Sequence, residues 1–312
     1  MDSIIHTVRT HYAIDIRELE QQKGGWASLA YKVHDGKIDY FLKAYEKHRA
    51  STPKLTANMN HYVPVLLWLK ENSSLNEKIS VPILTNNQAY TCEDEMNIYM
   101  LFDFIEGDTI GDQTLTSHQV KQFAQIISEL HAYGEDIPID TDAIKEDFDV
   151  PFLEPLWHIL SSEHHAPSDV WQLLRTTVAP IKEKIIRVER LAQHLQSADL
   201  RMALCHTDLH SWNLMQSRHV ILIDWEGMKL APVEADMIFL VDKPFFNDFL
   251  EMYRQKHPNY SIHPEALQFY QEKRKLEDIW EFIEQLMYDE QEEREREVTM
   301  NYLKEELKLI RM

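Results

Sequence analysis

The sequence predicts an α+β protein of two lobes, in which an antiparallel sheet comes first and a larger, mainly helical part follows. The chain has 312 residues, 44% of them hydrophobic, which is long for one undivided core. Over roughly the first hundred residues, apolar and polar residues alternate in short runs, as in strands with one buried face. From Thr116 the apolar residues recur at helical spacing instead. We therefore expect an N-terminal lobe over residues 1–102 and a C-terminal lobe over residues 103–312.

The N-terminal lobe is expected to contain five strands and two helices. Its start is typical of an amphipathic helix that leads into a strand. Asp35-Gly36 supplies a turn within an antiparallel meander. A helix is expected at about 62–71, because Pro64 is tolerated only in a first turn. The expected strands cover residues 14–25, 26–33, 37–45, 80–84 and 97–105.

Helical patterns dominate the C-terminal lobe. The helix after Thr116 has Ser117 as a candidate cap. A long helix is expected over 169–196, bent near Pro180. Two later stretches, 245–255 and 264–291, also have helical patterns, and the charged run at 289–298 is typical of a solvated helix face.

Charge and composition exclude several classes of partner. The formal net charge is −20, whereas nucleic acids and anionic membranes require clustered Lys and Arg. A cationic small molecule suits an acidic surface, although acidity also simply keeps a chain soluble. No apolar run is long enough to span a membrane, the start lacks the order of a signal peptide, and two distant cysteines indicate no disulfide framework. We expect a cytoplasmic protein without nucleic-acid or membrane partners.

One stretch, "LCHTDLHSWNLM" at 204–215, concentrates chemically active side chains. It is followed by "VILIDWE", an apolar run typical of a buried strand that ends in Asp224. Phosphoryl transfer needs a carboxylate to orient and deprotonate an incoming hydroxyl, together with oxygen ligands for magnesium. Asp208 can do the first, and Asn213 with Asp224 can do the second.

Two other interpretations of this stretch stay open. His206, Asp208 and His210 alternate, so on a strand they would share a face and could hold a metal ion. Zinc sites usually draw on further His or Cys nearby, and the sequence shows no such motif. The stretch could also be a hydrogen-bonded structural turn.

The stretch nevertheless resembles a known family. "HTDLHSWN" has the H-x-D-x-x-x-x-N form of a kinase catalytic loop, and "IDWE" stands where kinases carry D-F-G. Together with "GMKLAPVEADMIFL", the segment is similar to the aminoglycoside phosphotransferase family, especially its spectinomycin-phosphotransferase-like members. The resemblance implies a protein-kinase-like two-lobed fold. It also implies transfer of the γ-phosphoryl group of ATP (or GTP), with Mg²⁺, to a hydroxyl of a small molecule.

Carried onto this chain, the resemblance makes Asp208 the catalytic base and Asn213 and Asp224 the metal ligands. His206 would support the loop, and Asp236 would brace it through its backbone. His210 would lie near the substrate or pack as a structural imidazole.

The nucleotide-binding residues are less fully matched. Lys43 stands where kinases place the lysine that contacts phosphates, although a lysine at a strand end can also snorkel at a sheet edge. Its usual glutamate partner on the next helix is missing, and Asn60 and His61 lie roughly at that position. This departure raises the prospect of weak nucleotide affinity or a degenerate kinase.

Two further segments are assigned to the nucleotide by position. Gly24 and Gly25 stand where the phosphate-covering loop falls, but a plain β-turn explains them equally well. Residues 101–105 resemble the segment joining the lobes, with backbone contacts to adenine expected at Asp103 and Ile105. The sequence contains no Walker-type P-loop motif.

The acceptor is the least determined feature. Glu277, Asp278 and Glu281 lie within about one helical turn, beside Trp280, and could bind an amine; they could equally face solvent. The leading hypothesis is an antibiotic-resistance enzyme acting on an aminoglycoside or aminocyclitol such as spectinomycin. The alternatives are a small-metabolite kinase acting on choline, homoserine, methylthioribose or similar, and a catalytically weak kinase-like binding protein. The sequence leaves the oligomeric state and the physiological role open.

Overall fold

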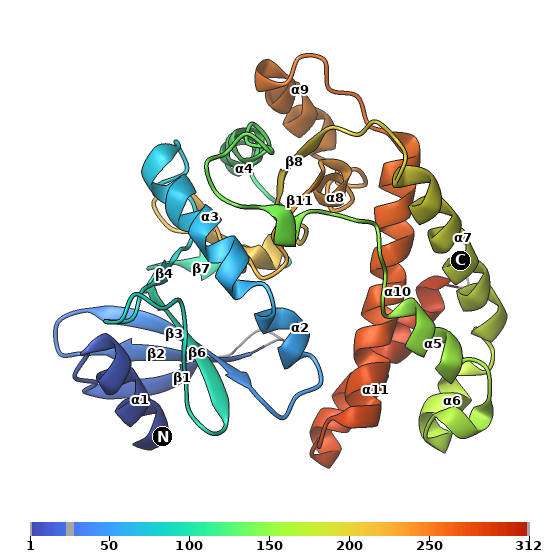
Figure 1. Ribbon diagram of the computed structural model, residues 1–312, viewed down its shortest axis with the longest axis horizontal. Helices are drawn as coiled ribbons and strands as arrows, with labels where there is room; N and C mark the ends of the chain where they lie inside the picture. The colour runs from blue at the N-terminus through green and yellow to red at the C-terminus, as the bar shows by residue number, and fades with distance from the viewer. Residues whose placement is uncertain (1, 23–27, 311–312) are drawn as a thin grey trace. The chain divides into compact units, whose positions relative to one another are not determined.

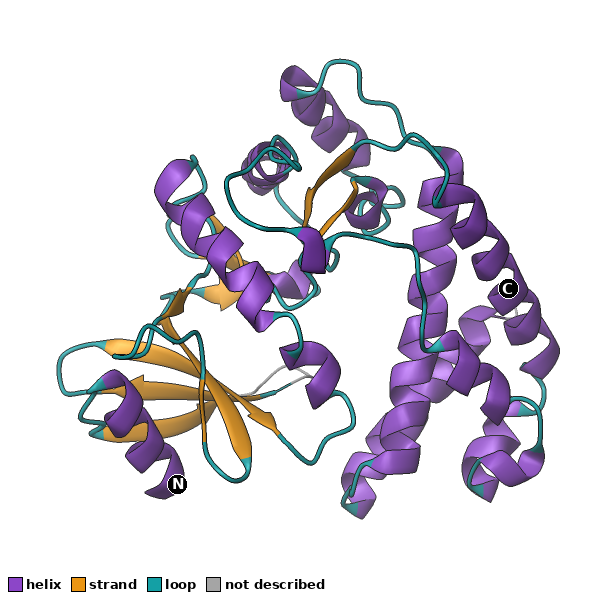
Figure 2. Ribbon diagram, in the orientation of Figure 1, coloured by secondary structure: helices purple, strands orange, loops and turns teal. Residues whose placement is uncertain are grey.

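The computed structural model describes residues 2–22 and 28–310 of the chain (Figures 1 and 2). The chain divides into two compact units. Unit 1 comprises Met1–His48, Thr52–Lys145 and Met202–Tyr260, and unit 2 comprises Arg49–Ser51, Glu146–Arg201 and Ser261–Met312. Each unit is described by itself. Gly24 and Gly25, to which the sequence assigns phosphate contacts, lie outside the described residues.

Unit 1 begins with the antiparallel sheet that the alternating pattern predicts. The strand order is β1-β2-β3-β6-β4, with β5 also paired to β6. The predicted turn is confirmed at Asp35-Gly36, where Gly36 has φ +94° and the Asp35 carboxylate accepts two backbone N–H groups. The strands are β1 (Glu18–Gln22), β2 (Leu29–His34), β3 (Asp39–Glu46), β4 (Pro82–Ile83), β5 (Cys92–Glu93) and β6 (Asn97–Asp103).

Helix α1 (Asp2–Tyr12) covers part of this sheet and completes its core (Figure 1). Ile4, Val8 and Tyr12 recur at helical spacing and are buried against strand residues such as Leu42 and Leu101. The predicted amphipathic helix at the start of the chain is confirmed.

Two helices, α2 (Thr52–Thr56) and α3 (Met59–Asn72), follow β3. Helix α3 begins three residues before the predicted start, so that Pro64 lies inside it rather than in its first turn. A proline there removes one backbone hydrogen bond. The largely buried face of α3, which includes Val63, Leu66 and Leu69, offsets that loss.

The rest of unit 1 carries short strands and three helices. Thr116, not Ser117, caps α4, in a capping box with Gln119. Strands β10, β9 and β7 form one small sheet, and β11 pairs with β8. These elements are β7 (Asp108–Thr109), α4 (Ser117–Leu130), β8 (Met202–Cys205), β9 (Leu214–Gln216), β10 (Val220–Leu222), β11 (Lys229–Pro232), α8 (Glu234–Met237) and α9 (Phe246–Lys256), with short 3₁₀ helices at Asp142–Ile144 and Ser211–Asn213.

Unit 2 is helical. The single long helix expected over 169–196 is wrong: α6 and α7 are separate, and the break comes before Pro180, which lies in the first turn of α7, where proline is tolerated. Buried Glu272 joins two of the helices by binding Lys184 at 2.5 Å and Arg187 at 3.1 Å. The helices are α5 (Leu153–Ile159), α6 (Ser168–Leu174), α7 (Val178–Leu195), α10 (Pro264–Tyr288) and α11 (Glu293–Ile310), with a 3₁₀ helix at Glu163–His165.

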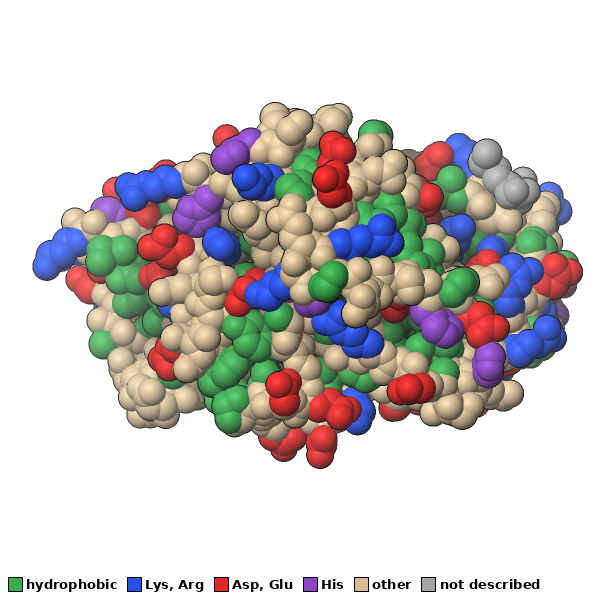
Figure 3. Space-filling view, turned by 90° about the horizontal axis from the view of Figure 1, so that it is seen from above, with side chains coloured by type: hydrophobic (Ala, Val, Ile, Leu, Met, Phe, Trp, Pro, Cys, Tyr) green, Lys and Arg blue, Asp and Glu red, His purple; other side chains and the backbone are tan. Residues whose placement is uncertain are grey.

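The predicted fold class is confirmed: an α+β protein with an N-terminal antiparallel sheet and a larger helical remainder (Figure 2). Across the described residues, every helix is too short or too polar to cross a membrane. Figure 3 shows acidic and basic side chains interspersed on one face, in a chain whose net charge is −20.

Candidate active site

Unit 1 brings the predicted catalytic stretch together around one amide. Asn213, at the end of a 3₁₀ turn, donates from Nδ2 to the Asp208 carbonyl oxygen and to Asp208 Oδ2, each at 2.9 Å. Since the amide nitrogen is directed at Asp208, the Asn213 Oδ1 atom is the one presented to other partners. The Asp208 side chain is about one-third exposed, so its carboxylate is accessible to solvent.

The loop also fixes the strand that carries the second acid. The Ile223 N–H donates to the Asn213 carbonyl at 3.0 Å, and His206 Nε2 donates to the Ile223 carbonyl at 2.8 Å. On the other side, Leu222 exchanges backbone hydrogen bonds with residues 78–80. Asp224, which follows Ile223, has φ +65°, a left-handed conformation that is uncommon for a residue with a side chain. The backbone is therefore held on both sides at the point where Asp224 emerges.

His206 supports this arrangement and is not available as a metal ligand. It is fully buried, and while its Nε2 serves the Ile223 carbonyl, its Nδ1 accepts the Asp208 N–H at 3.3 Å. His210 binds Asp208 Oδ2 through Nε2 at 3.1 Å. Because both ring nitrogens of His206 are engaged, the metal site of His206, Asp208 and His210 considered from the sequence is not formed.

The Asp236 side chain binds the backbone of the loop that carries Asp208. Its carboxylate is fully buried and accepts the His206 N–H at 3.0 Å and the Thr207 N–H at 2.6 Å. Thr207 has φ +68°, and its hydroxyl donates to the Gly227 carbonyl at 2.6 Å. A Cβ at Gly227 would lie 2.5 Å from Thr207 Oγ1, so this close approach requires glycine. Asp236 thus binds two successive backbone N–H groups just before Asp208.

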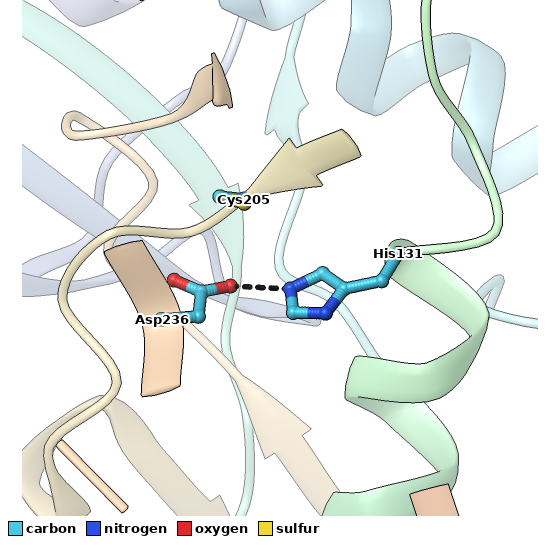
Figure 4. A group of neighbouring side chains, drawn as sticks. All are labelled: His131, Cys205 and Asp236. Carbon is cyan, nitrogen blue, oxygen red and sulfur yellow. Dashed lines mark hydrogen bonds and ion pairs between the residues drawn. The ribbon is translucent and has the colours of Figure 1, made fainter. Parts of the chain in front are cut away.

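A buried histidine completes the brace, and the sequence did not reveal it. His131 Nε2 binds Asp236 Oδ2 at 2.9 Å, and its Nδ1 pairs with the Tyr253 hydroxyl at 3.0 Å. Figure 4 shows His131 facing the Asp236 carboxylate, with Cys205 nearby. Among the described residues, these three side chains form a group close enough to hold a metal. The Cys205 thiol instead donates to backbone carbonyls of β11, and the other two residues bind each other, so the group is a structural network.

Lys43 reaches the site from β3 and meets two carboxylates. Its Nζ lies 2.7 Å from Asp224 Oδ1 and 2.5 Å from Glu226 Oε1. Burial would lower the pKa of Lys43, but the charges of Asp224 and Glu226 outweigh it and raise that pKa above its ordinary value. Burial likewise opposes ionisation of Glu226, and the Lys43 charge overcomes it and lowers the pKa of Glu226. The Lys43 ammonium and the Glu226 carboxylate are thus both charged near neutral pH.

Glu226 is a second site residue that the sequence did not reveal. A partner of Lys43 was expected on the next helix, before Glu71, whereas Glu226 lies 183 positions away in "IDWE". Asn60 and His61, placed at the partner position from the sequence, are both exposed. The sequence feature that could have indicated this partner is Glu226 itself, the second acid of "IDWE", two residues after Asp224.

The remaining predicted residues belong to other elements of the chain. Asp103 is the exposed last residue of β6, and Ile105, two residues later, is half-buried in the segment after this strand; their contact with adenine stays a prediction. Glu277, Asp278 and Glu281 belong to α10 of unit 2, whereas Asp208 belongs to unit 1. Their contact with an acceptor also stays a prediction.

Asp278 has an unusual protonation equilibrium. Its Oδ1 lies 2.7 Å from Arg274 Nε, and its side chain is 27% exposed. Burial raises the pKa of Asp278 from 3.8 to about 7; Arg274 opposes this shift, and the charges of Glu281 and Glu306 add to it. Near neutral pH, this carboxyl is therefore partly protonated.

We expect Asp278→Asn to stabilise the protein at pH 8 and to have little effect at pH 4. Because the folded pKa of about 7 lies above the unfolded value of 3.8, the contribution of Asp278 to stability is present below about pH 4 and is lost as pH rises from there to about 7. The expected gain at pH 8 is about 1–2 kcal/mol, discounted for partial exposure. Thermal unfolding at both pH values measures it, with Glu305→Gln, at an exposed position of α11, as control. An equal effect of Asp278→Asn at both pH values would contradict the assignment.

A profile of the phosphotransferase enzyme family matches residues 18–272. The chain belongs to this family. The match includes all the residues of the cluster formed by Lys43, Asp208, Asn213, Asp224 and Glu226. The resemblance drawn from the catalytic stretch is confirmed, and the chain is a phosphotransferase.

Solved structures of similar fold cover nearly the whole chain. A spectinomycin phosphotransferase, in complex with ADP and spectinomycin, has a TM-score of 0.73 at 20% identity over 99% of this chain and 97% of that one. A microcompartment-associated aminopropanol kinase has a TM-score of 0.65 at 15% identity over 100% and 97%. An aminoglycoside phosphotransferase from Streptomyces rimosus, in complex with ADP and streptomycin, has a TM-score of 0.58 at 15% identity over 88% and 97%. No curated protein matches by sequence.

Proposed function

We propose that this protein transfers the γ-phosphoryl group of ATP, with Mg²⁺, to a hydroxyl of a cationic small molecule. Three contacts carry the proposal: Lys43 binds Asp224, the neighbouring Ile223 N–H binds the Asn213 carbonyl, and the Asn213 amide binds Asp208. Solved structures of the same fold that contain ADP or AMP support the use of an adenine nucleotide. GTP is the alternative donor.

The side chains suit a magnesium ion. Asn213 presents an amide oxygen and Asp224 a carboxylate, and hard oxygen donors are the ligands that Mg²⁺ prefers. When bound, the ion supplies charge neutralisation at the nucleotide phosphates. Lys43 adds a fixed positive charge for phosphate oxygens, and its ammonium is buried, which strengthens that interaction.

Asp208 performs the proton chemistry. Its carboxylate orients the incoming hydroxyl and accepts its proton as the oxygen attacks phosphorus. Asn213 and His210 hold Oδ2 in place, and Asp236 fixes the backbone of the preceding residues, so the base is positioned before substrate arrives.

For the acceptor, we propose an aminoglycoside or aminocyclitol such as spectinomycin. The net charge of −20 favours a cation, and the fold is shared with phosphotransferases crystallised with spectinomycin and streptomycin. The aminopropanol kinase and a putative fructosamine-3-kinase from Haemophilus somnus support a small amino alcohol or sugar amine as the alternative. A catalytically weak binding protein is less favoured than the sequence suggested, because Lys43 does have carboxylate partners.

The acceptor is identified by ADP release with a panel of hydroxyl compounds, each confirmed by mass spectrometry of the phosphorylated product. We expect cationic acceptors, aminocyclitols first, to raise ADP release at least about tenfold above the rate with water alone. Neutral sugars and diols of similar size are the matched controls. Equal activity with neutral and cationic acceptors would contradict the charge argument, and no phosphorylated product from any compound would contradict the proposed function.

A further inference from the structure

We propose that Glu226 positions Lys43 for the nucleotide phosphates, in place of the helix glutamate that this chain lacks. The inference rests on the proposed function and adds a positioning residue to it. Glu226 belongs to the segment after β10, and its carboxylate reaches the lysine of β3 at 2.5 Å.

Two side chains of β3 hold the Glu226 carboxylate in place. Lys43 and Tyr45 are two residues apart on β3 and therefore point to the same face of the sheet. Both bind Glu226 Oε1, the lysine through its ammonium and the tyrosine through its hydroxyl. Tyr45 is fully buried, and the Glu226 side chain is only 12% exposed. A carboxylate with two donors on one oxygen, largely removed from water, is held in a single geometry.

The two helices that follow β3 in the chain provide no acidic residue as a partner for Lys43. Helix α2 has no acidic residue, and Glu71, the acid of α3, lies near that helix's C-terminal end. Helix α3 instead presents Tyr62, a buried side chain whose pKa is raised, first by burial and then by the charges of Glu226 and Asp224. Among the described residues, the acids that form ion pairs with Lys43 are Asp224 and Glu226.

These two acids differ in exposure, and the difference separates their roles. The Asp224 side chain is 37% exposed, whereas that of Glu226 is 12% exposed. A metal ion at Asp224 would compete with Lys43 for that carboxylate, because both are cations that bind the same oxygens. Glu226 would then remain as the carboxylate that keeps the buried ammonium in place. The chain thus supplies one acid for the metal and another for the lysine.

The test is a double-mutant cycle on nucleotide binding, which requires no acceptor. Equilibrium dissociation constants for a fluorescent ATP analogue with Mg²⁺ are measured for the wild type, Glu226→Gln, Lys43→Ala and the double variant. We expect Glu226→Gln to weaken binding about tenfold, and the double variant to be within about twofold of Lys43→Ala, because Glu226 acts through the lysine. Additive losses would overturn the proposal.

A second measurement separates positioning from metal ligation. In Glu226→Gln, the Mg²⁺ concentration that half-saturates nucleotide binding should stay unchanged; a rise of about tenfold or more would make Glu226 a metal ligand and overturn the proposal. Glu272→Gln is the matched control, since Glu272 is also a buried glutamate 2.5 Å from a lysine, and it should leave nucleotide affinity unchanged. If Glu226→Gln does not fold, Tyr45→Phe replaces it. This variant removes one donor to the same oxygen and should weaken binding about threefold; unchanged affinity would count against the proposal.

The outcomes distinguish the inference from the proposed function. A wild type that binds nucleotide but phosphorylates no acceptor contradicts the function, while a non-additive cycle still supports the role of Glu226. A wild type that phosphorylates an acceptor but gives an additive cycle contradicts only the inference. A wild type that binds no nucleotide overturns both.

Discussion

Replacing Asp208 by Asn is expected to lower kcat by about 10³-fold or more while leaving nucleotide affinity within about threefold of the wild type. The amide cannot accept the proton of the incoming hydroxyl. It is nearly the same size as the carboxylate, and its oxygen can still accept the hydrogen bond from Asn213 Nδ2. The loss should therefore appear in the chemical step and not in binding.

The measurement is acceptor phosphorylation under saturating ATP, together with the dissociation constant for the nucleotide. Asp248→Asn, an exposed acid in the first turn of α9, is the control and should retain full activity. Retention of more than a tenth of the wild-type kcat by Asp208→Asn would show that another group takes the proton.

Replacing Asp224 by Ala is expected to abolish the Mg²⁺-dependent part of nucleotide binding, a loss of about 100-fold or more in affinity. The substitution removes the carboxylate proposed to hold the metal and one of the two counter-ions of Lys43. Because Asp224 has φ +65°, alanine also introduces backbone strain of about 1 kcal/mol. Asp224→Asn separates these effects, since asparagine tolerates this conformation and has no charge.

Titrations of nucleotide with and without Mg²⁺ measure the effect for both variants. We expect both to lose the response to the metal, with only the alanine variant also less stable in thermal unfolding. Without Mg²⁺, the wild type and Asp224→Asn should bind the nucleotide with similar affinities. An Asp224→Asn protein that responds to Mg²⁺ like the wild type would contradict the assignment of Asp224.

Local patterns explain which parts of the fold the sequence predicted. The strands of the meander and the turn at Asp35-Gly36 were predicted correctly, because side-chain alternation and turn chemistry are local properties. The break between α6 and α7 was missed because it falls at Arg175–Thr177, which lack Gly or Pro, while Pro180 fits a first turn. The boundary at Thr116 was off by one residue because Ser117 is an equally good cap by type.

The candidate site likewise contains residues that local patterns predict and residues that they do not. Asp208, Asn213 and Asp224 lie within one short stretch, so their spacing was visible, and the structure links them through backbone and side-chain contacts. Glu226 and His131 depend on contacts between distant segments, which no local pattern encodes. Even so, both are ordinary residues of their types: an acid after a strand and a histidine at the C-terminal cap of α4.

The central claim is that Asn213 and Asp224 hold a metal ion on a nucleotide whose terminal phosphate faces Asp208. A crystal structure with Mg²⁺ and a non-hydrolysable ATP analogue tests it most directly. The account predicts an ion about 2.1 Å from Asn213 Oδ1 and from an Asp224 carboxylate oxygen, with Asp208 beside the γ-phosphate. An ion or a triphosphate bound elsewhere, with these side chains unligated, would contradict it.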